Sequence, residues 1–206
     1  MAPTLLQWAK AVLYNGLGRY ADALAAAQRT GEDPHELIFS TWTAAELIEA
    51  AARSGTPERA AGALERLSDS TRATGSNWAL GVEACARALL SEGQTADRLY
   101  REAVDRLGRT RLRVELARAH LLYGEWLRRQ NRRIDAREQL RTAYQMFAAM
   151  GADGFAERTR RELLATGERV RNRAADTPPG SPPGRLRSAG WPATGCPTPR
   201  SRPSYS

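Results

Sequence analysis

The sequence predicts an all-α protein built from stacked helical hairpins, that is, a right-handed α-solenoid with a disordered C-terminal tail. Residues 1–176 are rich in Ala, Leu, Arg and Glu, which favour helix. Apolar residues recur there at the three- and four-residue spacing of amphipathic helices. Small turn residues recur at Gly18, Gly55, Gly93 and Asn131, at intervals of 37, 38 and 38 residues. These intervals are close to the repeat lengths of helical solenoids, which is why stacked hairpins are expected.

The hairpin within Arg111–Met150 shows the pattern most clearly. It keeps the relative spacings of the tetratricopeptide repeat, a helix–turn–helix hairpin, at five positions: Gly124, Leu127, Ala136, Leu140 and Ala143. Gly124 is small where the two helices would approach each other closely, and Ala136 should face it. Because one hairpin cannot bury its own apolar face, neighbouring hairpins must stack on it.

Two further positions repeat in step with the turns. Seven residues before each turn, the chain has mostly small residues: Ala11, Ile48, Ala86 and Gly124. Five residues after each turn, where a small residue is expected, it has Ala23, Ala60, Arg98 and Ala136. Arg98 is the exception to this pattern.

We expect nine helices, at about 4–17, 20–30, 36–54, 57–73, 77–92, 95–107, 111–130, 133–149 and 153–173. The first eight make four hairpins, and the ninth is a charged helix that caps the solenoid or leads into a following domain, so the solenoid spans residues 1–173. Leu5, Leu6 and Trp8 make the first helix apolar on more than one side. Solenoids normally begin with a polar capping surface, so we expect this chain to begin inside a longer solenoid.

Residues 174–206 form a tail rich in Pro, Gly and Arg. Eight of the eleven prolines lie between Pro178 and Pro203, and a segment of this composition cannot bury a core. We therefore expect the tail to be disordered.

The net charge of +8 is divided between the two parts. Residues 177–206 have four arginines and no acidic residue, which leaves +4 on residues 1–176, where basic and acidic residues are interleaved. This balance favours an ordinary solvated surface over a nucleic-acid footprint. Cys85 and Cys196 provide no disulfide framework. No signal peptide or membrane-spanning apolar run is present, so we expect a cytoplasmic protein that does not contact a membrane.

The sequence has no pattern typical of a catalytic, cofactor or metal site. Lys10 is the only lysine, and no Gly-rich phosphate-binding loop precedes it. His35 and His120 are far apart and have no Cys/His spacing suited to zinc. We therefore expect no enzyme activity, no cofactor site and no metal site in this chain.

A solenoid offers a concave groove lined by the first helix of each hairpin. In the tetratricopeptide register the candidate partner-binding residues are Trp8, Trp42, Glu49, Glu83, Arg87, Arg118, Glu125 and Arg128. A partner would bind there. The alternative for each residue is that the tryptophans pack between repeats and the charges solvate the surface.

Several segments together resemble the tetratricopeptide-like region of the large LuxR-type transcriptional regulators. They are Gly81–Ser91, Leu99–Ala103, Arg113–Arg128, Asp135–Leu140 and Phe147–Ala152. The resemblance covers about residues 1–176 and is most specific in 113–152.

In that family an ATP-binding domain precedes the solenoid and a LuxR-type helix-turn-helix follows it. The resemblance implies an inducer or partner on the solenoid, ATP on the first domain and promoter DNA on the helix-turn-helix. This chain contains neither flanking domain. It is therefore expected to be the signal-sensing and protein-interaction module of such a regulator, without its ATPase and DNA-binding parts. Specific promoter binding would require the missing recognition helix.

The tail offers a second link to this family. If Ser181–Ser206 is back-translated with GC-rich codons and read from the last base of the Gly180 codon, it can encode LTAREAQIGRLARDGLSNPEIAAQLF. That sequence resembles the opening of a LuxR-type helix-turn-helix. We therefore hypothesise a one-base frameshift near Thr177–Gly180, which would make the tail an out-of-frame product with no evolved function.

Two alternative functions remain open from the sequence. The first is a self-standing tetratricopeptide adaptor that docks a partner peptide in its groove, although the apolar Leu5, Leu6 and Trp8 argue against a chain that begins with a cap. The second is a nucleic-acid-binding protein that uses its arginines, with an affinity that falls steeply with salt. Trp191 and Tyr205 are the only stacking residues of the tail, which makes the second alternative the weaker one.

Overall fold

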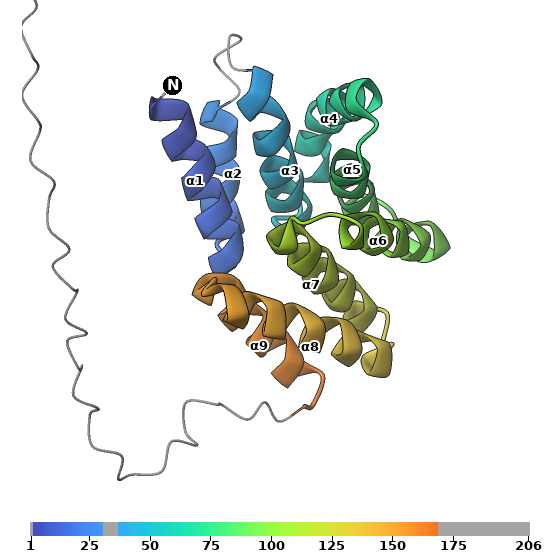
Figure 1. The fold of residues 1–206 in the computed structure, drawn as a ribbon. Helices are drawn as coiled ribbons and strands as arrows, with labels where there is room; N and C mark the ends of the chain where they lie inside the picture. The colour runs from blue at the N-terminus through green and yellow to red at the C-terminus, as the bar shows by residue number, and fades with distance from the viewer. Residues whose placement is uncertain (1, 31–36, 169–206) are drawn as a thin grey trace, which may run out of the picture. The chain divides into compact units, whose positions relative to one another are not determined.

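The computed structural model describes residues 2–30 and 37–168, and these residues are all-helical (Figure 1). They contain nine α-helices, one short 3₁₀ helix and no strand. The elements are α1 (Ala2–Leu17), α2 (Tyr20–Thr30), α3 (Leu37–Arg53), η1 (Pro57–Ala60), α4 (Ala61–Thr74), α5 (Asn77–Leu89), α6 (Gly93–Gly108), α7 (Arg113–Arg129), α8 (Arg133–Met150) and α9 (Asp153–Ala165).

Each of the nine predicted helices is present, and most of their ends agree to within a few residues. The largest difference is at the end of α9, which was expected near residue 173 and lies at Ala165. Gly167 adopts a left-handed backbone with φ of +85°, and Thr166 receives a 2.6 Å hydrogen bond on its carbonyl from Arg137 Nη2. The helix cannot continue through this backbone conformation. The predicted domain boundary at 173 and the tail at 174–206 lie outside the described residues.

All four predicted turn residues have a positive φ; Gly18, Gly55 and Asn131 lie between consecutive helices, and Gly93 is the first residue of α6. The values are +75° at Gly18, +77° at Gly55, +57° at Gly93 and +60° at Asn131. Glycine and asparagine reach this left-handed region most readily, so backbone conformation explains why these residues recur. Three turns also share one hydrogen bond, from the N–H after the turn residue to the carbonyl five residues earlier: Arg19 to Tyr14 at 2.8 Å, Thr56 to Ala51 at 3.0 Å and Arg132 to Leu127 at 3.0 Å.

Consecutive helices pack against each other throughout the described chain, as Figure 1 shows. The odd-numbered helices α1, α3, α5 and α7 also contact one another in succession, and α1 contacts α9. The first and last helices of the described region are therefore neighbours in space although they are far apart in sequence.

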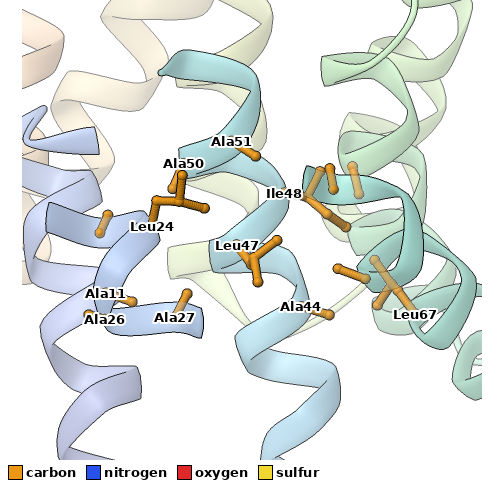
Figure 2. Close-up of a cluster of buried hydrophobic side chains, with 14 residues drawn as sticks. Ala11, Leu24, Ala26, Ala27, Ala44, Leu47, Ile48, Ala50, Ala51 and Leu67 are labelled. Carbon is orange, nitrogen blue, oxygen red and sulfur yellow. The ribbon is translucent and has the colours of Figure 1, made fainter. Parts of the chain in front are cut away.

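Alanine dominates the core between α1, α2, α3 and α4 (Figure 2). Ala11, Ala27 and Ala51 are completely buried there, beside Leu24 and Ile48. A methyl side chain lets helix axes approach closely, so these positions hold the hairpins together by close packing.

The exception at Arg98 is explained by a local shift in the third hairpin. Arg98 is exposed, and Ala96 is the completely buried small residue near the start of α6. The corresponding alanines of the other hairpins, Ala23, Ala60 and Ala136, are completely buried. In the third hairpin the buried position therefore lies two residues earlier than the turn spacing predicts.

Gly124 lies at the predicted close approach of α7 and α8. A Cβ atom at this position would lie 2.6 Å from Leu140 Cγ and 3.3 Å from the carbonyl oxygen of Ala136. Gly81 has the same role between α5 and α6, where a Cβ would lie 2.6 Å from Leu107 Cγ. Both contacts are shorter than van der Waals packing allows, so a larger residue would push the two helices of its hairpin apart.

We predict that Gly124→Ala lowers the free energy of unfolding by about 1–3 kcal/mol, because the added methyl group overpacks the α7–α8 contact. Gly62→Ala is the matched control. A Cβ at Gly62 would meet Arg66 Nη1 at an ordinary 3.5 Å, and the helix propensity of alanine should stabilise α4 by about 0.5–1 kcal/mol. Urea unfolding followed by circular dichroism measures the free energy of unfolding of both variants. Equal changes in Gly124→Ala and Gly62→Ala would contradict the close approach of α7 and α8.

Candidate binding cavity and buried ion-pair network

Charged side chains from α3, α7 and α9 meet in the interior of the protein. Glu46 and Glu49 are three residues apart on α3, and Arg118 and Glu125 are seven apart on α7, so each pair shares one helix face. Arg158 reaches them from α9. Each of these five residues is at most 9% exposed. Together with Arg53, which pairs with Glu125, they form what we call the ion-pair network.

Arg118 connects α7 to α3. Its Nη1 donates to Glu46 Oε1 at 2.5 Å, and its Nη2 donates to Glu46 Oε2 at 3.0 Å and to Glu49 Oε2 at 2.7 Å. Asn15 brings α1 into the same arrangement, because its Nδ2 donates to Glu46 Oε2 at 2.9 Å. Two-point contacts of this kind fix the orientation of the guanidinium plane.

Arg158 connects α9 to three other helices. Its Nη1 donates to Glu49 Oε1 at 2.6 Å and to the backbone carbonyl of Asn15 at 3.0 Å. Its Nε and Nη2 donate to the two oxygens of Glu125 at 2.8 and 2.9 Å. Arg53 Nη2 donates to Glu125 from the end of α3. Arg158 therefore holds α9 to α1, α3 and α7 at one point.

The network is electrically balanced. Three carboxylates, Glu46, Glu49 and Glu125, are joined by hydrogen bonds to three guanidinium groups, Arg53, Arg118 and Arg158. A buried charge without a partner is strongly unfavourable, so each member depends on the others to remain ionised inside the protein.

The pKa values reflect this mutual dependence. Burial by itself raises the pKa of Glu49, but Arg158 and Arg118 outweigh it and lower the pKa from 4.5 to about 2. Glu125 behaves in the same way: burial raises its pKa, and Arg158 and Arg53 lower it below the ordinary value. Burial lowers the pKa of Arg158, yet Glu125 and Glu49 hold it well above its usual range. Glu49, Glu125 and Arg158 are therefore ionised at neutral pH.

A cavity of about 340 Å³ adjoins the network. Four aromatic side chains line it, each from a different helix: Trp8, Trp42, Trp78 and Phe155. Three charged residues also line it: Glu46, Glu115 and Arg118. The rest of the lining is apolar and consists of Val12, Ala45, Leu67, Ala79, Val82, Leu112 and Val114. Because Glu46 and Arg118 belong to both, the cavity and the network share a wall.

The aromatic rings of the cavity are held in defined positions. The ring centroids of Trp8 and Trp42 are 5.4 Å apart with an angle of 43° between the planes. Arg118 Cζ lies 5.5 Å from the centroid of the Phe155 ring, and Phe155 stacks in turn on Phe147 at 5.1 Å. Aromatic pairs and cation–π contacts at these distances are attractive.

Glu115 differs from the other carboxylates of this region. The ion pair that the structure gives it is a 4.0 Å contact with Arg118 Nη1. Burial raises the pKa of Glu115, and the attraction of Arg118 does not cancel this effect. The cavity wall thus holds a carboxylate whose charge is poorly compensated.

The structure brings together five of the eight residues predicted for the groove. Glu49, Arg118 and Glu125 are buried in the ion-pair network, and Trp8 and Trp42 line the cavity. That any of them binds a partner stays a prediction.

The other three predicted groove residues form separate local contacts. On α5, Arg87 Nε donates to Glu83 Oε1 at 2.8 Å, and Ser68 Oγ of α4 donates to the same oxygen at 2.8 Å. Arg128 Nε donates to Glu162 Oε2 of α9 at 2.6 Å. These contacts lie outside the network and the cavity lining.

Sequence reasoning missed Glu46, Trp78, Glu115 and Arg158. Glu46 had a recognisable signal, because it lies with Glu49 in the otherwise apolar run Ala44–Ala52, where an acidic residue must be buried or paired. Arg158 had none, since it lies among other charged residues of its helix. Only packing distinguishes it from them.

The described residues contain no group of three or more His, Cys, Asp or Glu side chains placed to hold a metal ion. In the same part of the chain, every helix is too short or too polar to cross a bilayer. No family model, curated protein or solved structure matches the sequence or the fold.

We predict that Arg158→Met lowers the free energy of unfolding by about 3–5 kcal/mol, because it leaves Glu49 and Glu125 as buried carboxylates with too few partners. Arg158→Lys should recover only part of the loss, since an ammonium group cannot make the two-point contact. The control is Arg72→Met, which removes the exposed pair with Asp69 and should change little. Chemical unfolding measures the free energy of unfolding of all three variants. An Arg158→Met variant as stable as the parent would contradict a structural role for the network.

The lowered pKa of Glu49 predicts acid sensitivity. Its folded-state pKa of about 2 lies below the ordinary 4.5, so its contribution to stability is complete above about pH 4.5. As the pH falls from about 4.5 to about 2, the unfolded chain binds the proton more readily and roughly 3 kcal/mol is lost. Across this range, the free energy of unfolding of Glu49→Gln should fall less steeply with decreasing pH than that of the parent. Glu138 is exposed, so Glu138→Gln should show the same pH dependence of stability as the parent. If Glu138→Gln changed that dependence as much as Glu49→Gln does, the acid sensitivity could not be attributed to Glu49.

Proposed function

We propose that the hairpins form a tetratricopeptide-like, right-handed α-solenoid. Turns at intervals of 37 and 38 residues, each with a left-handed turn residue, support this arrangement. The contacts among α1, α3, α5 and α7 also support it, because first helices of successive repeats line the inner surface of such a solenoid.

We further propose that the chain is the signal-sensing and protein-interaction module of a LuxR-type transcriptional regulator, acting in the cytoplasm and without catalytic activity. The observation that carries the sensing role is the direct link between the cavity and α9, whereas the relationship to these regulators rests on the sequence resemblance of residues 81–152. Arg118 lines the cavity and bonds to Glu49, and Glu49 bonds to Arg158 of α9. A protein or small-molecule inducer that altered the contacts of Arg118 would therefore alter the hold on α9.

The contacts of α9 suit such a role. Besides Arg158, α9 carries Arg161, whose Nη2 donates to the carbonyl oxygen of Leu17 at 3.3 Å. Both arginines thus donate to backbone carbonyls in the last turn of α1. In LuxR-type regulators the DNA-binding segment follows the solenoid. A helix that senses the cavity and precedes that segment could pass on the signal by a change in its packing.

The test is to sequence the coding DNA from the Arg171 codon to well beyond the stop codon. We expect the neighbouring frame to encode an intact helix-turn-helix that begins near Ser181. The tail would then be an out-of-frame product, and the chain would be a regulator that has lost its contact with promoter DNA. If no frame encodes a helix-turn-helix, the relationship to these regulators fails, and the adaptor with a peptide in its groove becomes the better proposal.

A further inference from the structure

The charges that line the cavity do not balance. Glu46 and Glu115 supply two carboxylates to the lining, and Arg118 supplies one guanidinium group. Arg118 is already bonded at 2.5–3.0 Å to Glu46 and Glu49, so its charge is committed to the network. Glu115, 4.0 Å from Arg118 Nη1, is the carboxylate left over. The cavity wall therefore has a net negative charge, which favours a cation inside it.

The remaining surface of the cavity suits a cation of a particular kind. Three indole rings, from Trp8, Trp42 and Trp78, and the phenyl ring of Phe155 line a space of about 340 Å³. A metal ion or an unsubstituted ammonium ion would lose strong hydration there and find few oxygen ligands. An ammonium group with alkyl substituents is weakly hydrated, and aromatic faces attract it through their quadrupoles.

We propose that this cavity binds a small organic cation with an alkylated ammonium group, with the three tryptophans around its alkyl groups and Glu115 as its counter-ion. This inference rests on the proposed sensing function, because it names the ligand class of the cavity through which that function would operate. The volume is within the range of small-molecule pockets, which is about 300–1,000 Å³. The bound cation would also approach Arg118 from the cavity side, at the point where the network begins.

The experiment is isothermal titration calorimetry of the full chain with choline and with its neutral isostere 3,3-dimethylbutan-1-ol. The two probes have nearly the same shape, and one carries a quaternary nitrogen where the other carries a carbon. We expect choline to bind at least about tenfold more tightly, because only the cation gains from Glu115 and the ring faces.

Three variants and one control identify the groups responsible. Glu115→Gln should weaken choline binding about tenfold and leave binding of the neutral isostere unchanged. Trp78→Leu should weaken choline binding, whereas Trp78→Phe should retain most of it, because it keeps an aromatic face. Glu102→Gln removes a carboxylate on α6 that pairs with Arg106 outside the cavity, and it should bind choline as the parent does. Thermal unfolding of each variant checks that it is folded.

Equal affinity for the two probes would overturn the proposal, because the cavity would then be merely apolar. Absence of binding by either probe to the folded parent would overturn it as well. Neither result bears on the relationship to LuxR-type regulators, which is tested by the sequence of the coding DNA. An intact helix-turn-helix in the neighbouring frame combined with no choline binding would leave a sensing module with a different ligand.

Discussion

Arg158 makes the contacts on which the tertiary arrangement depends most. Its guanidinium group joins α9 to Glu49 of α3, to Glu125 of α7 and to a backbone carbonyl of α1. Arg158 and Asn15 are 143 positions apart in the sequence. Packing between consecutive helices can form from local contacts alone, but the meeting of the first and last helices requires a long-range interaction. Arg158 supplies it, together with the packing of the Phe155 ring against Gly16.

A network of six ion-paired side chains, five of them buried, is an energetically costly way to hold helices together. Each charge loses several kcal/mol of hydration on burial, and well-packed apolar residues of the same volume often stabilise a protein as much or more. What the network adds is directionality, since each guanidinium group donates hydrogen bonds to carboxylates mainly in its own plane. We infer that the network selects one arrangement of α1, α3, α7 and α9, and that the cavity beside it owes its shape to that selection.

The cavity and the network differ in how firmly their charges are compensated, and this difference bears on function. Glu49 is held ionised by two arginines, so it is a structural charge at any physiological pH. Glu115 has one distant partner, and burial raises its pKa. A ligand can therefore improve the environment of Glu115 at little cost to the fold. That asymmetry makes the wall near Glu115 the part of the cavity best suited to recognition.

The sequence by itself determined the helices and their turns. Apolar periodicity and glycine or asparagine at the turns are local signals, because a helix and its cap depend on residues a few positions apart. Those signals correctly placed Gly124 and Asn131, but they missed the shift at Ala96 and the early end of α9. Only the tertiary structure decided the site. Whether Glu49 and Arg118 point into an open groove or into a buried network depends on where α9 packs, and that is fixed by Arg158, a residue that no local pattern distinguishes from its charged neighbours.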